Sequence, residues 1–114
     1  MTSLGIDVEA VVQTAESHSA LAYCFTPDEL EILAATADGP ILGFAAKEAL
    51  FKAINPLTHV FFDFLDAKIV GIDNSSMHLE LLVDVGPGHL RGSNYKACWR
   101  HFEGHVLVAV RLFA

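Results

Sequence analysis

The segment Ile41–Ile54, with the sequence ILGFAAKEALFKAI, indicates the fold more clearly than any other part of the chain. At about 100° per residue, its small and apolar side chains share one face. The other face carries three charged residues, Lys47, Glu48 and Lys52, which flank Phe51. The segment therefore predicts an amphipathic helix, and its small residues would let a second layer of structure pack closely against it.

Proline and glycine mark the expected limits of this helix. Gly39-Pro40 breaks the chain before it, and Asn55-Pro56 ends it, because a residue that precedes proline disfavours helical backbone. Another helix is predicted earlier, where Thr26 precedes a proline and Glu29 follows three residues later. This is a capping box, in which side chains satisfy the free N–H groups at a helix start. That helix should run to about Ala37.

Beyond this region the pattern changes from helical to strand-like. Five segments are rich in β-branched and aromatic residues, and turn sequences separate them. They are Val60–Phe64, Ala67–Ile72, Met77–Val85, Tyr95–Phe102 and His105–Phe113. One of the turn sequences, Glu103-Gly104, predicts a tight hairpin. Near the N-terminus, Ser3–Val8 has the pattern of a short strand and Val11–Tyr23 that of a helix. The order predicts an α+β domain with helices packed on one face of a mainly antiparallel sheet.

The composition is typical of a chain that folds. The 114 residues are 53% hydrophobic and 18% charged, without an internal repeat, low-complexity tract or linker. This predicts one domain over residues 1–114, with apolar surface left to bury in a partner. No apolar run is long enough for a membrane span, and the first residues lack the pattern of a secretory signal. We therefore expect no membrane partner and a cytoplasmic location.

The net charge of −7 argues against nucleic acid as a partner, because such binding relies on lysine and arginine. The distribution of the charges is more informative than their sum. Up to Ile54 the only basic residues are Lys47 and Lys52, and they stand among eight acidic ones. Two lysines about one helical turn apart therefore stand out.

The first candidate site is the sequence Gly5-Ile6-Asp7-Val8-Glu9. Strand alternation places Asp7 and Glu9 on the same face, roughly 7 Å apart along the strand. Carboxylates at this spacing suit a hard cation such as Mg²⁺, which binds one or two of them and completes its octahedron with phosphate and water. The alternative is a solvated strand edge, which is the usual context of such a pair.

The charged face of the helix also allows two interpretations. Glu48 and Lys52 have the spacing of an ordinary ion pair on an exposed helix, worth a few tenths of a kcal/mol. Taken with Asp7 and Glu9, however, the two segments supply three carboxylates and two lysines on two defined faces. Such a set is what a metal-bridged pyrophosphate site requires.

Together the two segments resemble the paired signature of the 4′-phosphopantetheinyl transferases. GIDVE at residues 5–9 is followed by FAAKEALFK at residues 44–52, and both match the family motifs position by position. Phe25–Leu30, Ile54–Pro56 and His105–Val110 are also similar to segments of the family. The resemblance implies a phosphopantetheinyl transferase-like half-domain. It also implies Mg²⁺-dependent transfer of 4′-phosphopantetheine from coenzyme A to a serine of an acyl or peptidyl carrier protein, with release of 3′,5′-ADP.

The resemblance implies a role for each candidate residue. Asp7, Glu9 and Glu48 match the acids that bind magnesium. Glu48, directly or through a water, is also the candidate base for the serine proton, and Lys52 matches a catalytic position at the developing charge. Lys47 and Lys52 match positions that contact the phosphates of coenzyme A.

The length separates this chain from the enterobactin-synthetase type of the family. Those enzymes have two similar halves and the chain resembles the second, whereas its length is that of the holo-acyl-carrier-protein synthase type, which assembles as a trimer. We therefore expect a homo-oligomer, either a dimer or a trimer, in which another copy supplies the missing wall of the site. Two alternatives stay open. One is a non-catalytic relative that binds coenzyme A, a nucleotide or a carrier protein without turnover, and the other is an excised domain of a longer enzyme.

Overall fold

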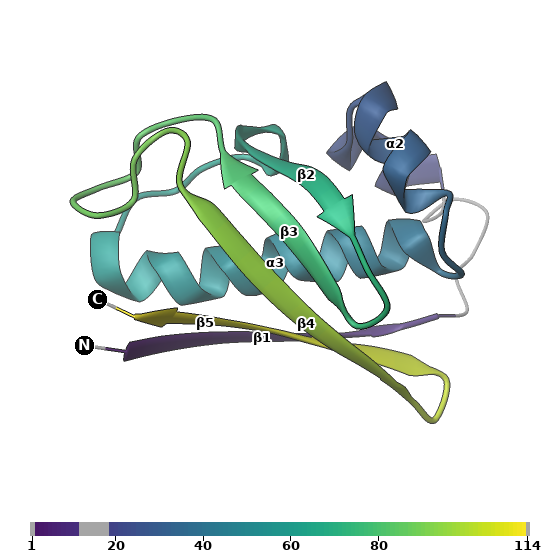
Figure 1. The fold of residues 1–114 in the computed structure, drawn as a ribbon. Helices are drawn as coiled ribbons and strands as arrows, with labels where there is room; N and C mark the ends of the chain where they lie inside the picture. Colours follow the sequence, from purple (N-terminus) through teal and green to yellow (C-terminus); the bar gives the residue numbers. More distant parts are fainter. Residues whose placement is uncertain (1, 12–18, 114) are drawn as a thin grey trace.

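The structure is a computed structural model, and it describes residues 2–11 and 19–113. One strand and then helices make up the first half of the chain, and the second half forms a strand meander (Figure 1). In chain order the elements are β1 (Thr2–Ala10), η1 (Ala22–Cys24), α2 (Pro27–Leu33), α3 (Gly39–Thr58), η2 (Phe64–Asp66), β2 (Ala67–Ile72), β3 (Ser76–Leu81), β4 (Asn94–Phe102) and β5 (His105–Phe113). The elements labelled η are short 3₁₀ helices.

The strands form one antiparallel sheet in the order β1-β5-β4-β3-β2. Because β1 pairs with β5, Thr2 lies opposite Phe113 and the two ends of the chain lie close together (Figure 1). β4 and β5 are joined by a tight turn at Glu103 and Gly104, both of which have positive φ, as a twisted two-residue hairpin turn requires. The predicted hairpin and the predicted α+β class are therefore confirmed.

The core lies between α3 and the face of the sheet that the helix covers (Figure 1). Alanines of α3 permit this close packing, since Ala45, Ala49 and Ala53 are fully buried. The sheet contributes alternate residues of its strands, as expected for a sheet with one covered face. They include Ala67, Ile69, Met77, Leu79, Leu81, Ala97, Val106, Val108 and Val110.

The helix limits differ in part from those predicted. The capping box at Thr26 is confirmed, because its side chain accepts from the Glu29 backbone N–H and the Glu29 carboxylate accepts from the Thr26 N–H. α2 ends at Leu33, however, several residues before the predicted end. α3 begins at Gly39 and continues through Pro56 to Thr58, so the predicted stop before this proline was wrong. Proline removes one hydrogen bond there, and the helix ends only a short way beyond it.

Two strand predictions were also wrong, and one helix prediction falls largely outside the described residues. Val60–Phe64 was expected to be a strand, but it packs beside α3 and leads into η2 instead of joining the sheet. The strand predicted over Met77–Val85 ends at Leu81. Of the helix predicted over Val11–Tyr23, residues 12–18 lie outside the described ranges, while residues 19–21 are helical and lead into η1.

The outer face of the sheet carries exposed apolar side chains. On β1 these are Leu4, Ile6 and Val8, of which Leu4 is 57% exposed, and Phe102 adds another on β4. Among the described helices, none is both long and apolar enough to cross a membrane.

Candidate functional site

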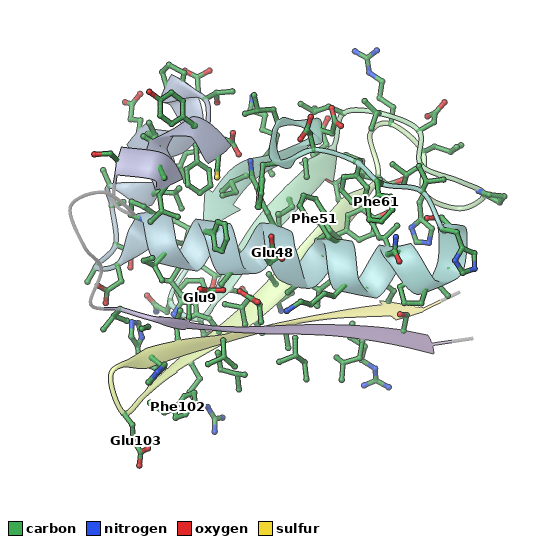
Figure 2. All side chains as sticks on the ribbon, turned by 180° about the vertical axis from the view of Figure 1, so that it is seen from behind. Glu9, Glu48, Phe51, Phe61, Phe102 and Glu103 are labelled. Carbon is green, nitrogen blue, oxygen red and sulfur yellow. The ribbon has the colours of Figure 1, made fainter. Side chains whose placement is uncertain are left out.

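The two carboxylates of β1 lie on one face of the strand, as alternation predicts, and this face is turned toward α3. Asp7 is 6% exposed, whereas its neighbours Ile6 and Val8 face outward. Lys52 of α3 reaches across the gap, and its Nζ donates to Asp7 Oδ1 at 2.8 Å and to the Ile6 carbonyl at 3.2 Å. Figure 2 shows Glu9 between β1 and α3, near the turn of the helix that carries Glu48. The structure therefore brings together four of the five predicted site residues.

This cluster has an excess of negative charge. The second oxygen of Asp7, Oδ2, is buried and has no hydrogen-bond donor. Burial first, and then the Asp7 carboxylate and the charge of Glu48, raise the pKa of Glu9 to about 7. The pKa of Glu48 is also raised, by burial and then by Asp7. Lys52, which is half exposed, has a raised pKa because it donates a hydrogen bond to Asp7, so one cation faces three acids.

A divalent cation fits this arrangement of side chains. Within residues 2–11 and 19–113, no three acidic, histidine or cysteine side chains are already grouped closely enough to enclose a metal ion. Mg²⁺ does not need an all-protein cage, because it typically uses one or two carboxylates and takes its other oxygens from phosphate and water. Asp7 Oδ2 is a buried oxygen without a donor, which is the kind of atom a cation satisfies. Asp7, with Glu9 and Glu48 beside it, would hold the ion.

Lys47, the fifth predicted site residue, lies apart from this cluster. Its side chain is fully buried, and Nζ lies 2.8 Å from Glu29 Oε2, which is itself 1% exposed. Nζ also donates to the backbone carbonyls of Cys24 and Phe64, at 3.0 and 2.7 Å. Burial lowers the pKa of Lys47, while the hydrogen bond and charge of Glu29 oppose that shift. Lys47 was expected on the same helix face as Glu48 and Lys52, opposite the small residues. Its side chain is instead buried against Glu29, whereas that of Lys52 is half exposed.

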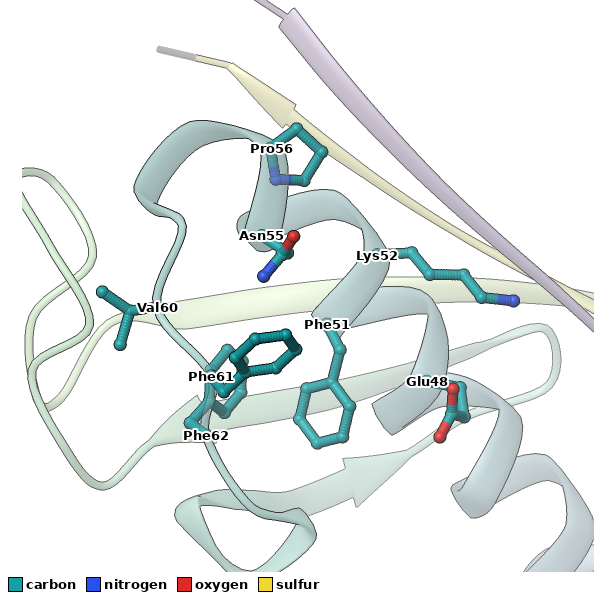
Figure 3. Close-up of a pocket in the computed structure, with 8 residues that line it drawn as sticks. All are labelled: Glu48, Phe51, Lys52, Asn55, Pro56, Val60, Phe61 and Phe62. Atoms are coloured by element: carbon teal, nitrogen blue, oxygen red, sulfur yellow. The ribbon is translucent and has the colours of Figure 1, made fainter.

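A cavity of about 410 Å³ opens beside the cluster. Glu48 and Lys52 form its polar end, and the rest of its lining is mainly apolar (Figure 3). Phe61 and Phe62, from the segment that follows α3, face Phe51 of the helix in Figure 3. The remaining lining residues are Asn55, Pro56 and Val60. The site thus combines an acidic cluster, one accessible cation and an adjoining apolar pocket.

The comparisons with known proteins agree with these motifs. The family model of the 4′-phosphopantetheinyl transferase superfamily matches residues 3–110. The chain belongs to this superfamily. Among solved structures, the holo-[acyl-carrier-protein] synthase of Thermotoga maritima is similar, with 22% sequence identity and a TM-score of 0.69. That similarity supports the fold, and it covers 98% of this chain and 64% of that chain.

No curated protein matched the chain. The family model therefore assigns the chain to the phosphopantetheinyl transferase superfamily, and the solved synthase structure supports its fold. This neighbour does not have the length expected for the synthase type, since the chain spans only 64% of it. The similarity therefore supports the fold and does not assign the activity of the whole enzyme to this chain.

The sequence prediction missed the aromatic wall of the pocket. Phe61 and Phe62 belong to an apolar run that was assigned to a strand, and Phe51 was noted only as a neighbour of charged residues. One signal was available, since Phe51 follows three residues after Glu48 and lies on the same side of the helix. The apolar segment after α3 takes its position from tertiary packing, and no periodic pattern in the sequence signals such packing.

The raised pKa of Glu9 predicts that this member of the superfamily loses stability as pH rises. Its pKa is about 7 in the folded chain, against the ordinary glutamate value of 4.5 that applies once the chain unfolds. Between these two values the folded form therefore binds more protons than the unfolded form. The free energy of unfolding should fall from pH 4.5 to 7 and then level off. We expect Glu9→Gln to remove much of this slope.

Urea unfolding in EDTA between pH 5 and 8 measures this effect. Glu31→Gln is the matched control, because Glu31 is exposed on α2 and should leave the slope intact. Parallel stability curves for the wild type and Glu9→Gln across this range would show that Glu9 titrates normally.

Proposed function

We propose that this chain transfers the 4′-phosphopantetheine group of coenzyme A to a serine of an acyl or peptidyl carrier protein, with Mg²⁺ bound and 3′,5′-ADP released. The proposal rests on family membership and on one observation above all: a buried oxygen of Asp7 without a donor, on a carboxylate that Lys52 contacts and that raises the pKa values of Glu9 and Glu48. Such a cluster gains from a divalent cation, because the cation supplies the positive charge that the side chains lack and can in turn hold a phosphate.

Asp7, Glu9 and Glu48 would hold the metal ion. When bound, Mg²⁺ neutralises the pyrophosphate charge and aligns the phosphate for displacement. Lys52 is suited to contact a phosphate directly, since its Nζ lies beside Asp7 while half of its side chain remains exposed. The raised pKa of Lys52 keeps it charged at neutral pH.

Glu48 is the residue we assign as the base. Its raised pKa makes it a better proton acceptor than an ordinary glutamate, and it lies at the polar end of the pocket. The serine proton passes to Glu48, directly or through a water, as the serine oxygen bonds to the β-phosphorus of coenzyme A. The bond from that phosphorus to the bridging oxygen breaks, and the oxygen leaves with 3′,5′-ADP.

The apolar pocket would receive the arm that is transferred. It begins at Glu48 and Lys52, where the phosphate would lie, and continues along Phe51, Phe61 and Phe62. The pantetheine arm carries a gem-dimethyl group close to its phosphate, and an apolar wall suits that group better than water does.

A homo-oligomer, either a dimer or a trimer, is part of the proposal. Supporting it, Leu4, Ile6 and Val8 expose an apolar row on β1, which is an edge strand of the sheet. Burial of this row against another copy would stabilise both. A mass measurement that finds only monomer at micromolar concentration would contradict this part.

Intact-mass spectrometry of an apo carrier protein tests the function. We expect incubation with this chain, coenzyme A and Mg²⁺ to add the mass of one phosphopantetheine, and EDTA to prevent the gain. If the carrier protein still gains phosphopantetheine in EDTA, the transfer does not require the metal, and this part of the proposal is wrong. Binding of coenzyme A without any gain in mass would instead favour the alternative, a non-catalytic relative that binds without turnover.

A further inference from the structure

Lys47 occupies an unusual position for a residue of a catalytic motif. Its ammonium group has three N–H donors, and three acceptors surround it at 2.7 to 3.0 Å: Glu29 Oε2 and the carbonyls of Cys24 and Phe64. Nζ also lies 4.9 Å from the centre of the Phe25 ring. With its side chain fully buried, Lys47 has no donor left for a phosphate in this arrangement.

Both carboxylate oxygens of its partner Glu29 also accept hydrogen bonds. One carboxylate oxygen accepts from the Thr26 N–H, and the other accepts from the Ile69 N–H at 2.9 Å as well as from Lys47. The pair thus joins α3 to η1, α2, η2 and β2 at a single point. A buried pair with all its hydrogen bonds made is costly to break from one side, because the remaining charge is left without a partner.

One of these bonds reaches the wall of the pocket. Phe64, whose carbonyl Lys47 holds, packs its ring against Phe44 and Phe51, with ring centres 5.3 and 5.1 Å apart. Phe62 lies two residues earlier and meets Phe51 edge to face at 4.5 Å. Residues 59–63, which include Phe61 and Phe62, form no helix or strand, so this wall has no ladder of its own hydrogen bonds. The position of residues 59–63 therefore depends on α3 before them and on η2 after them, where Lys47 donates to the Phe64 carbonyl.

We propose that Lys47 is a positioning residue, which fixes the aromatic wall of the pocket by holding the Phe64 carbonyl, and that it does not bind phosphate itself. The inference rests on the proposed function, in which the pocket receives the pantetheine arm. Two consequences follow. Loss of Lys47 should weaken binding of the arm more than binding of the nucleotide, and it should loosen residues 59–66 before the rest of the fold.

Calorimetric titration of Lys47→Met with coenzyme A and with 3′,5′-ADP, both with Mg²⁺, separates these roles. The nucleotide has the phosphates but lacks the arm. We expect affinity for coenzyme A to fall by at least about ten-fold, and affinity for 3′,5′-ADP to change by less than about two-fold. Lys68→Met, a lysine of β2 outside the site, serves as control and should change neither. An equal loss for both ligands would overturn the inference, since it would place Lys47 at a phosphate.

Hydrogen exchange gives a second reading that does not depend on the proposed function. The Asp66 N–H donates to the Asp63 carbonyl and the Asp63 N–H to the Asp66 carboxylate, which protects both amides. In Lys47→Met these amides should exchange at least about ten-fold faster, while those of β4 and β5 keep their rates. Unchanged exchange at Asp63 and Asp66 would overturn the inference.

Two further outcomes can be separated in the same experiments. If the wild type binds neither ligand, the proposed function fails, and the exchange rates alone decide the role of Lys47. If Lys47→Met does not fold, Lys47→Met combined with Glu29→Gln leaves no unpaired charge and keeps an acceptor at position 29. The same ligand comparison and the same exchange measurement then apply to the double variant.

Discussion

Replacing Asp7 with alanine is expected to reduce the rate of phosphopantetheine transfer by at least about a hundredfold, because a bound metal supplies several kcal/mol of charge stabilisation and each 1.4 kcal/mol is a factor of ten. Asp7 has the buried oxygen without a donor and also holds Lys52 in place. Its loss would therefore weaken both the metal site and the orientation of the cation.

The same change should cost little stability when no metal is bound. Asp7 is a nearly buried carboxylate, and its Oδ2 has lost its hydration without gaining a donor. Its ion pair with Lys52 involves a side chain that is half exposed, and such pairs contribute about 1 kcal/mol or less. We expect the free energy of unfolding in EDTA to change by about 1 kcal/mol at most, in either direction.

Rate assays and thermal unfolding with and without Mg²⁺ check both statements. A ligand that binds only the folded state stabilises it, so Mg²⁺ should raise the Tm of the wild type and leave that of Asp7→Ala unchanged. Glu31→Ala removes an exposed carboxylate from α2 and should behave as the wild type. If Asp7→Ala retains turnover and still responds to Mg²⁺, the assignment of Asp7 as a metal ligand is wrong.

The parts of this fold that the sequence predicted are those governed by local patterns. Alternation over residues 5–9 placed Asp7 and Glu9 on one face, and β1 has that arrangement. The capping box at Thr26 and the hairpin turn at Glu103-Gly104 were predicted because turn and cap residues act on their own neighbours. The contact between β1 and α3 could be predicted only through the resemblance of the two motifs to a family, because nothing local links segments this far apart.

The errors have a common physical origin in long-range contacts. The helical period placed Lys47 on the face of Glu48 and Lys52, but Glu29, buried on another helix, accepts a hydrogen bond from its ammonium group in the core. In the sequence, Glu29 had already been explained by the capping box, so no local signal pointed to a second role. Val60–Phe64 has a strand composition, yet the edge of the sheet is occupied by β2 and its phenylalanines pack on α3 instead.

Replacing Gly5 with alanine is expected to destabilise the fold by at least about 3 kcal/mol, at the upper end of what overpacking costs. A Cβ at this position would lie 1.8 Å from the Ala49 carbonyl oxygen and 2.6 Å from the Ala53 nitrogen, both in the backbone of α3. Backbone atoms within a helix cannot rotate away as a side chain can. The strand would have to move off the helix, and the hydrogen bond from Ser3 Oγ to the Ala53 carbonyl, 2.7 Å long, would be strained with it.

Gly71→Ala is the matched control for this effect. Gly71 also lies in a strand, β2, but a Cβ there would meet nothing closer than a ring carbon of His78 at 3.9 Å, which is an ordinary contact. Its stability should change by about 1 kcal/mol or less, since the substitution also reduces the entropy of the unfolded chain. Urea unfolding of the two variants measures the difference, and equal stabilities would show that β1 and α3 separate at little cost.

The consequence of Gly5→Ala extends to the site, because Asp7 and Glu9 follow at alternate positions on the same face of β1. A strand displaced from α3 carries both carboxylates away from Glu48 and Lys52. At a temperature where the variant is still folded, we therefore expect stabilisation by Mg²⁺ to be lost even though every acidic residue is present. A full response to Mg²⁺ in folded Gly5→Ala would mean that the carboxylates do not need this close approach of strand and helix to act together.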